Sequence, residues 1–378
     1  MPAPVILQVL PSLVTGGVER GTIEITEAIA AAGWTALVAS AGGKLVPAIA
    51  RAGGRHITMP LDTRNPIQIL RNAIRLARLI EAEGVSLIHA RSRAPAWSAY
   101  LAARRTGTPF VTTYHGAYGE DLPFKRHYNA VMARGAIVIA ASRYIAGLIE
   151  SRHRTDPARI RVIPRGVDPA RFDPATITGP RVAKLAEAWH LPEDARVLML
   201  PGRLTGWKGQ SVLIAALARL AATDTVAVLV GSDQGRRAYA ARLLRQATSL
   251  GLADRVRFAG ECPDMPAALA LADVVIHAST APEAFGRVVI EAQAMARPVI
   301  AADLGGPVET VAHGITGWRV PPGEPAALAA AIDAVLALPP ETRAAIGAAA
   351  RDAVLAHCTT AGMQAATLAV YREVLKLG

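Results

Sequence analysis

The stretch 283-EAFGRVVIEAQAMARPVI-300 runs from a loop through a helix into a short apolar strand. The loop around Glu283 and Gly286 opens a helix that we predict over 287–296. Pro298 ends this helix, because proline lacks a backbone N–H and clashes with the preceding turn. The apolar strand Val299–Ala302 follows directly. A helix leading at once into a short apolar strand is typical of a parallel sheet covered by helices.

Two glutamates of this stretch stand where a ligand could be held. Glu283 lies at the mouth of the predicted helix, and Glu291 lies about one turn inside it. The first N–H groups of a helix lack partners within the helix and attract anionic or hydroxyl-rich ligands. Two carboxylates beside them suit a polyhydroxy ligand, although an ordinary amphipathic helix with a capping acid would show the same pattern.

The same alternation of strands and helices runs through the first half of the chain. The predicted strands are Val5–Leu10, Ala36–Ser40, His56–Met59, Leu87–His89, Phe110–Thr113, Ile137–Ala140 and Arg161–Ile163. The predicted helices are 18–32, 45–52, 66–82, 94–106, 123–133 and 143–152. The pattern pauses at 164-PRGVDPARFDPATITGP-180, whose prolines, aspartates and glycines indicate a linker.

The alternation then resumes in the second half. The predicted strands are Val197–Leu200, Val226–Val230, Val256–Phe258, Val274–His277 and Val299–Ala302. The predicted helices are 208–221, 236–249, 265–270 and 287–296, and the alanine-rich tail 324–376 is helical. We therefore predict two doubly wound, Rossmann-like α/β domains that face each other across a cleft. The expected parts are a first domain (1–178), a second domain (179–357) and a final helix (358–378) that packs toward the first domain.

The composition limits the class of protein. A chain of 378 residues with 52% hydrophobic residues can fill two cores. Aromatic residues make up only 4%, which disfavours a surface that stacks nucleic-acid bases. The two cysteines form no metal or redox motif, and a reducing cytosol fits them. We expect neither a signal peptide nor a membrane-spanning segment, because no apolar run approaches about 20 residues.

Positive charge is concentrated in the first half. Residues 1–180 hold 22 Lys and Arg against 12 Asp and Glu, whereas residues 181–378 hold 19 against 18. This excess fits an anionic partner such as a phospholipid surface or a lipid-linked phosphate; it also fits a solvated, arginine-rich surface. The residues expected on a membrane or acceptor face are Arg71, Arg75 and Arg78, which share one helix face, together with Lys125 and Arg126.

The usual nucleotide and metal motifs are missing from the sequence. It contains no GxGxxG, no GxxxxGK[ST], no DxD and no HExxH. A bound diphosphate would therefore have to be met by basic side chains and backbone N–H groups. The loop 201-PGRLTGWKGQ-210 offers Arg203 and Lys208 between a strand and a helix, with Gly202 among its turn residues. An ordinary strand–helix turn with surface cations remains the alternative.

Two further features of the first half stand at carboxyl ends of predicted strands. The loop 15-TGGVERG-21 contains Gly16 and Gly17, which let main-chain N–H groups approach an anion. His115 ends the strand 110-FVTTY-114, although a lone histidine is more often structural than catalytic.

Together these pieces resemble family 4 of the retaining glycosyltransferases, often called group 1, which have the GT-B fold. The resemblance covers essentially the whole chain. The linker motif N-G-V-D-x-x-x-F appears as 165-RGVDPARF-172, with Arg165 where asparagine is usual. The motif G-R-L-x-x-x-K-G appears as residues 202–209, and E-x-F-G-x-x-x-x-E-A appears as 283-EAFGRVVIEA-292. Arg165 lies in the expected linker, so it leaves the detail of the hinge open.

The resemblance implies a role for each candidate residue. Glu291 would hold the ribose of a nucleotide-sugar donor, and Glu283, with the backbone at Phe285 and Gly286, would hold hydroxyls of the donor sugar. The residues expected to act in catalysis are His115, Glu283, Arg203 and Lys208. Arg203 and Lys208, next to Gly202, would balance the diphosphate without a metal ion. Gly16 and Gly17 would close on the phosphates, and the segment 259-AGECPD-264, with Asp264, would lie near the nucleobase.

The resulting hypothesis is a metal-independent, retaining hexosyltransferase without a cofactor. It would move a sugar from a UDP- or GDP-sugar to a saccharide or lipid-linked acceptor in lipopolysaccharide or surface polysaccharide synthesis. We expect it in the cytoplasm, at the inner face of the cytoplasmic membrane, without a nucleic-acid partner. Retention follows from the resemblance only. The alternatives are a sugar-nucleotide epimerase of related fold and a non-enzymatic basic protein that binds nucleic acid.

Overall fold

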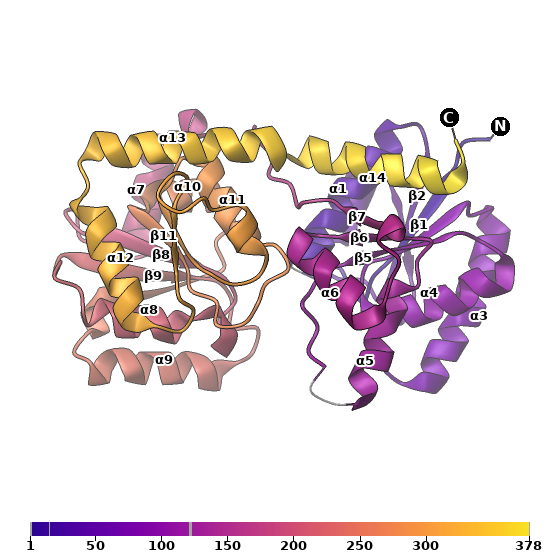
Figure 1. Cartoon of the computed structure of the whole chain (residues 1–378), viewed down its shortest axis with the longest axis horizontal. Helices are drawn as coiled ribbons and strands as arrows, with labels where there is room; N and C mark the ends of the chain where they lie inside the picture. The colour runs from indigo at the N-terminus through magenta and orange to yellow at the C-terminus, as the bar shows by residue number, and fades with distance from the viewer. Residues whose placement is uncertain (1, 15, 121–122, 378) are drawn as a thin grey trace. The chain divides into compact units, whose positions relative to one another are not determined.

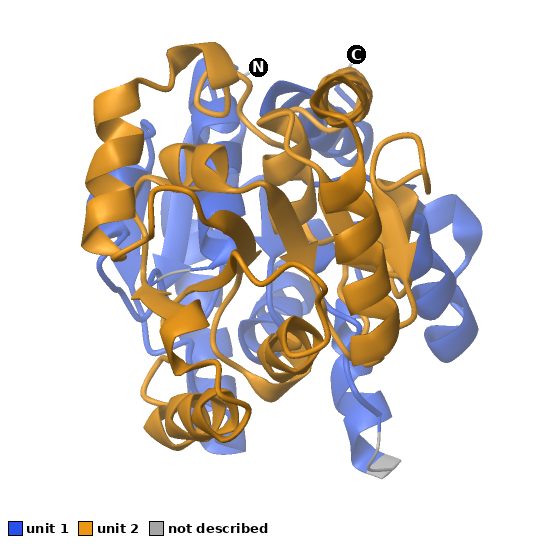
Figure 2. Cartoon of the chain, turned by 90° about the vertical axis from the view of Figure 1, so that its left-hand side faces the viewer, with its two compact units in different colours: residues 1–165, 360–378 blue, residues 166–359 orange. Residues whose placement is uncertain are grey.

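The chain folds into two compact units, coloured separately in Figure 2. A computed structural model describes residues 2–14, 16–120 and 123–377. Unit 1 comprises residues 1–165 and 360–378, and unit 2 comprises residues 166–359. The proline-rich stretch after residue 165 belongs to unit 2, because Val167 N donates to Cys358 O over 2.8 Å and Phe172 is buried.

Unit 1 is built on a seven-stranded parallel sheet in the order β3-β2-β1-β4-β5-β6-β7. Its strands are β1 (Val5–Val9), β2 (Thr35–Ser40), β3 (Arg55–Thr58), β4 (Leu87–Ala90), β5 (Phe110–Tyr114), β6 (Ile137–Ala140) and β7 (Ile160–Val162). Its helices are α1 (Gly17–Ala31), α2 (Val46–Arg51), α3 (Pro66–Glu83), α4 (Arg93–Thr106), α5 (Pro123–Asn129), α6 (Arg143–His153) and α14 (Thr360–Leu375). Figure 1 shows α3 and α4 side by side.

The last helix, α14, completes the core of unit 1. It packs against α1, and its Met363, Val370 and Tyr371 join a buried cluster with Ile6 and Ile25. The hydroxyl of Tyr371 lies 2.6 Å from Nδ1 of His89, a fully buried residue of β4. A segment far away in the sequence is therefore fixed to the middle of this sheet.

Unit 2 repeats the plan with a six-stranded parallel sheet in the order β10-β9-β8-β11-β12-β13. Its strands are β8 (Arg196–Pro201), β9 (Thr225–Val230), β10 (Val256–Gly260), β11 (Val274–His277), β12 (Val299–Ala302) and β13 (Trp318–Val320). Its helices are α7 (Gly179–Ala188), α8 (Gln210–Leu217), α9 (Arg237–Ser249), α10 (Met265–Leu271), α11 (Arg287–Ala294), α12 (Pro325–Ala337) and α13 (Pro340–His357).

Both sheets are doubly wound, which confirms the predicted fold class. From β1 the chain moves outward to β3 and then returns past β1 to β4, so the direction of winding reverses between β1 and β4. The corresponding reversal in unit 2 lies between β8 and β11. Ligands of such folds bind beyond the carboxyl ends of the strands at this switch point. The loops after β1, β4, β8 and β11 are therefore the first places to look for a site.

Several predicted elements need correction. The helix α7 falls partly in the predicted linker; its Gly179 and Pro180 suggested a turn, but Pro180 stands in the first turn, where a helix accepts proline. The strand β13 was missed because it has only three residues at the edge of the sheet. The helix predicted at 208–221 is shorter, since Gly206–Lys208 forms a separate 3-10 turn. None of the helices that the structure describes is long and apolar enough to cross a membrane.

Candidate functional site

The loops at the switch point of unit 2 approach each other backbone to backbone. Gly209 has a φ of 75°, and a Cβ at this position would lie 1.8 Å from the carbonyl oxygen of Ala278, just after β11. Thr280 N donates to Trp207 O over 2.8 Å. Only glycine permits this approach. The loop 202–209 is thereby held against the loop that follows β11.

This approach brings Lys208 to Glu283. Lys208 Nζ lies 2.6 Å from Glu283 Oε1, and His277 Nε2 lies 2.7 Å from the same oxygen. The hydroxyl of Ser279 donates to it as well. The Glu283 side chain is only 13% exposed, so three protein donors meet most of its charge. Lys208 and Glu283, predicted separately, thus form one buried ion pair.

The charge state of Glu283 follows from these neighbours. Burial alone would raise the pKa of its carboxyl, but the attraction of His277 and Lys208 and their hydrogen bonds outweigh burial and hold the pKa well below its usual range. Glu283 is therefore ionised at neutral pH. It can accept hydrogen bonds from hydroxyl groups, but it is a poor proton donor.

Glu291 lies on the inner face of α11, where its side chain is 11% exposed. Arg287 Nε lies 3.6 Å from Glu291 Oε1, one helical turn away. Gly286 begins this helix with a φ of 83°, and Phe285 before it is buried. The helix mouth is therefore shaped by backbone, with a largely buried carboxylate one turn inside it.

The remaining predicted residues of unit 2 lie in looser surroundings. Arg203 is exposed, with NH1 3.4 Å from Gln234 Oε1. Gly202, with a φ of 155°, starts the loop that carries Arg203 and Lys208. Asp264 caps α10, and its two oxygens accept hydrogen bonds of 3.0 and 2.7 Å from Arg181, which lower its pKa. Asp264 is thus engaged by a structural partner.

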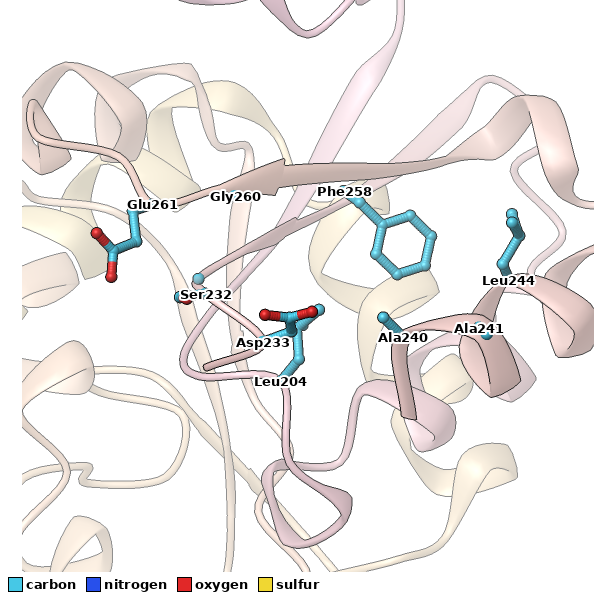
Figure 3. Close-up of a pocket in the computed structure, with 10 residues that line it drawn as sticks. Leu204, Ser232, Asp233, Ala240, Ala241, Leu244, Phe258, Gly260 and Glu261 are labelled. Atoms are coloured by element: carbon cyan, nitrogen blue, oxygen red, sulfur yellow. The ribbon is translucent and has the colours of Figure 1, made fainter. Parts of the chain in front are cut away.

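A cavity of about 430 Å³ opens beside the loops that follow β8, β9 and β10. Figure 3 shows the ring of Phe258 projecting from β10 toward Ala240 and Leu244, while Asp233 and Glu261 lie at the polar end. This end adjoins the segment 259–264. The cavity combines an apolar wall with acidic groups and is large enough for a heteroaromatic ring.

The predicted residues of unit 1 also lie at its switch-point edge. Gly16, with a φ of 149°, precedes α1, and Gly17 is the first residue of that helix. Thr15 of the same loop lies outside the described residues. His115 follows β5, and its Nε2 is buried without a hydrogen-bond partner in the described chain. Burial, and then the positive charges of Arg91 and Arg165, hold the pKa of His115 well below its usual range.

Two buried arginines of unit 1 were not recognised as part of this edge. Arg91 directly follows β4; it is 2% exposed, and its NH1 donates to Gln8 Oε1 over 3.0 Å. Arg165 was assigned to the linker, but it is 6% exposed within unit 1 and donates to Gly17 O over 2.8 Å. Its NH2 also lies 3.5 Å from Glu24 Oε2. Arg165 therefore supports the glycine pair directly, which the motif alone could not show.

Unit 2 also holds residues that the sequence reasoning missed. His277 and Ser279 lie at the end of an apolar strand, where a histidine looks like an ordinary core residue. The useful signal was their position at the carboxyl end of a switch-point strand, two residues apart and just before Glu283.

The predicted membrane face is exposed on α3. Arg71, Arg75 and Arg78 all face solvent, and the same side carries Ile67, Leu70 and Ile74, which are 63%, 57% and 46% exposed. On α5, Phe124 is 67% exposed, next to Lys125 and Arg126. Arg126 donates to Arg152 O, so part of its function is structural.

Two family profiles match the chain. The profile described as Glycosyltransferase Family 4 covers residues 15–171, and the one described as Glycosyl transferases group 1 covers residues 182–353. Among curated relatives, a D-inositol 3-phosphate glycosyltransferase of Catenulispora acidiphila is 30% identical over 80% of this chain and 76% of its own length. One of Salinispora arenicola is 34% identical over 66% of this chain, which spans only 60% of that relative.

Solved structures agree over the full length. A glycosyltransferase from Rickettsia africae is 38% identical, with a TM-score of 0.91 and complete coverage of both chains. The Anabaena protein HepE, solved in complex with UDP and glucose, is 26% identical with a TM-score of 0.86, over 97% of this chain and 98% of its own. Both comparisons extend over the two units described above.

Proposed function

The chain belongs to the group 1 glycosyltransferases, and we propose that it transfers a hexose-type sugar from a nucleoside diphosphate sugar to a saccharide or lipid-linked acceptor. The observation that carries this proposal is the buried Lys208–Glu283 pair at the switch point of unit 2. It places a cation and an ionised carboxylate side by side, as a ligand with both phosphate and hydroxyl groups requires.

The reaction breaks the bond between the anomeric carbon and the diphosphate while the oxygen of an acceptor hydroxyl bonds to that carbon, and the hydroxyl proton passes to the released diphosphate. Negative charge grows on the departing diphosphate, so cations placed there stabilise the transition state more than the bound donor. We assign this task to Lys208 and Arg203, without a metal ion or cofactor. Arg203 is exposed and held by one long hydrogen bond, so its guanidinium is free to turn toward phosphate oxygens.

The carboxylates hold the two sugars of the donor. Glu283 is ionised and accepts hydrogen bonds from hydroxyls of the transferred sugar, together with the backbone at Phe285 and Gly286. Glu291, largely buried one turn inside α11, accepts hydrogen bonds from the ribose. The cavity beside 259–264 would receive the base of a UDP- or GDP-sugar, and HepE, solved with UDP-glucose, supports the first of these. For unit 1 we propose that Gly16, Gly17 and His115 bind substrate during transfer.

The acceptor is proposed to be anionic. Residues 1–180 hold 22 Lys and Arg against 12 Asp and Glu, and the edge of unit 1 buries Arg91 and Arg165. The names of curated relatives contain a phosphorylated polyol, D-inositol 3-phosphate. A phosphate-bearing or lipid-linked saccharide, as in lipopolysaccharide or surface polysaccharide synthesis, would meet this charge. We also propose that the transfer proceeds with retention, as the family resemblance implies.

A membrane surface would explain the exposed side of α3. Its three arginines and three exposed aliphatic residues form a face of the kind that lies in a bilayer interface. We propose that unit 1 binds the inner face of the cytoplasmic membrane through α3, with Phe124, Lys125 and Arg126 of α5 as a second contact. Vesicle co-sedimentation tests this; equal binding to neutral and anionic vesicles would contradict it.

The decisive experiment screens UDP- and GDP-sugars with and without phosphorylated saccharide acceptors. We expect nucleoside diphosphate release that depends on the acceptor, and its loss in Glu291→Ala with the fold intact. Conversion of the donor into an isomer without any acceptor would instead favour an epimerase. Undiminished transfer by Glu291→Ala would contradict the assignment of the donor site.

A further inference from the structure

The carboxylate of Glu283 is held entirely through one of its two oxygens. Lys208 Nζ at 2.6 Å, His277 Nε2 at 2.7 Å and the hydroxyl of Ser279 all bond Oε1, and none of these three bonds Oε2. An isolated ion pair would leave a carboxylate free to rotate about its last bond. Three donors converging on one oxygen fix both oxygens at once, so the direction in which Oε2 points is determined by the protein.

The donors to Oε1 differ in their freedom to leave. His277 is the last residue of β11 and is 3% exposed, and Ser279 is 1% exposed. Both are attached to short, buried backbone at the carboxyl end of the strand. Lys208 has a long, flexible side chain on the loop 202–209, and a phosphate group would compete with Glu283 for its ammonium group.

The hydrogen positions on His277 follow from its partners. An ionised carboxylate can only accept, so His277 Nε2 must carry a hydrogen in either charge state of the ring. Its Nδ1 is buried and has no hydrogen-bond partner among the described residues. The one bond that His277 side-chain atoms make is therefore the bond to Glu283, and a glutamine amide could replace it.

We propose that His277 and Ser279 are positioning residues: they keep Oε1 of Glu283 bonded when Lys208 turns to the donor diphosphate, so that Oε2 stays directed at the transferred sugar. This inference rests on the proposed glycosyl transfer. Without the two fixed donors, recruiting Lys208 to the phosphates would leave a buried carboxylate with no protein partner at Oε1. The carboxylate would then turn, and the sugar hydroxyls would lose their acceptor in the transition state.

The test compares His277→Leu, His277→Gln and Ser279→Ala with the wild-type protein. Loss of a hydrogen bond to a charged group should lower kcat for His277→Leu about 10- to 100-fold. Binding of free UDP or GDP, which has no transferred sugar, should stay within about threefold of wild type. His277→Gln should recover most of the loss, because its amide can donate to Oε1. His357→Leu, at an exposed histidine in the same unit, is the matched control.

The outcomes separate the inference from the proposed function. Absence of transfer by the wild-type protein with every donor would remove the proposed function itself. Transfer by the wild type together with full activity of His277→Leu and Ser279→Ala would overturn the positioning role. An equal loss in His277→Leu and His277→Gln, accompanied by weaker nucleotide binding and a lower Tm, would also overturn it, because a general packing defect would then explain the data.

Discussion

The two units share a topology but place opposite charges at their switch points. In unit 2 the central buried charge is the carboxylate of Glu283, which lies against one lysine, one histidine and one serine. In unit 1 the buried guanidinium groups of Arg91 and Arg165 outnumber the carboxylate buried beside them, that of Glu24. The same sheet edge thus offers an acceptor in one unit and donors in the other.

The two edges leave different buried polar atoms unpaired. In unit 2, Glu283 Oε1 has three donors and the unpaired atom beside it is His277 Nδ1; in unit 1, Arg91 Nε and His115 Nε2 are buried with no hydrogen-bond partner in the described chain. Buried polar groups are normally paired, so an unpaired group at a sheet edge indicates a functional position. We infer that unit 2 holds its ligand groups pre-arranged, while unit 1 keeps positive groups toward which an anionic group would be attracted.

The largest effect is expected from separating the ion pair of unit 2. Lys208→Met leaves a buried carboxylate without its counter-charge, which should lower the free energy of unfolding by about 3–5 kcal/mol and kcat by about 10²- to 10³-fold. Adding Glu283→Gln should restore much of the stability but none of the activity. Urea unfolding and initial rates measure the two effects separately.

The control for this pair is Asp303→Asn, which breaks the ion pair between Asp303 and Arg319. The side chain of Asp303 is 50% exposed and that of Arg319 is 33% exposed. An exposed pair of this kind contributes about 0–1 kcal/mol. If Lys208→Met were no more destabilising than Asp303→Asn, the pre-arranged charge pair of unit 2 would lose its energetic basis.

The next effect concerns Arg165 in unit 1. Arg165→Leu removes the hydrogen bond to Gly17 O and the ion pair with the largely buried Glu24, and should cost about 3 kcal/mol of stability. Gly21→Ala tests the same contact by steric overlap, because the added Cβ would lie 2.0 Å from the Arg165 guanidinium. It should cost about 1–3 kcal/mol alone and clearly less in the Arg165→Leu background. Additive costs would show that the two residues do not meet.

Sequence reasoning succeeded where the information is local. Apolar runs predicted most strands to within a residue or two, and the turn residues after β8 and β11 marked the loops that carry Lys208 and Glu283. The bond between these two residues spans 75 positions and depends on Gly209 lying against Ala278. Nothing in the local pattern specifies such a contact.

Arg165 shows a second kind of failure. Its motif sits in a proline-rich segment, and a linker was the natural interpretation. Burial of its guanidinium depends on Gly21, which leaves room for it, and on Glu24, both of which lie on α1 far away in the sequence. The role of His277 could not be predicted for a related reason. A polar residue in an apolar strand gives no sign of its partner in the sequence, because the partner is brought to it only when the neighbouring loop folds.

The two units are expected to lose stability at different pH values in acid. Burial, before any other cause, holds the pKa of His89 and of His115 well below the usual range, so both are neutral in folded unit 1. In the unfolded chain both histidines take up protons below about pH 6.5. Their contribution to the free energy of unfolding is therefore fully present above that pH, and it falls by about 1.4 kcal/mol per pH unit for each histidine as the pH drops.

Glu283 in unit 2 also loses its contribution as the pH drops, but only at a lower pH than the two histidines. Its pKa is lowered in the folded state, so its contribution persists above the unfolded value of about 4.3 and is lost only under stronger acid. Hydrogen exchange measured at pH 5 and pH 7.5 should therefore show unit 1 opening before unit 2. Equal loss of protection in both units would contradict this order, and His89→Gln should reduce the acid sensitivity of unit 1.

The smallest effects on the fold are expected on the surface of unit 1, where the positive charge is not buried. Replacing Arg71, Arg75 and Arg78 with Gln should change stability by less than about 0.5 kcal/mol, since all three side chains are exposed. Binding to anionic vesicles should weaken by about 1 kcal/mol for each arginine removed, and turnover on a water-soluble acceptor should stay unchanged.

Ile74→Ser should weaken binding to the same vesicles even at high salt, because its contribution is apolar burial, which salt does not screen. If the triple variant instead lost turnover on a soluble acceptor and kept its vesicle binding, the charge on α3 would serve the acceptor and the membrane contact would have to lie elsewhere.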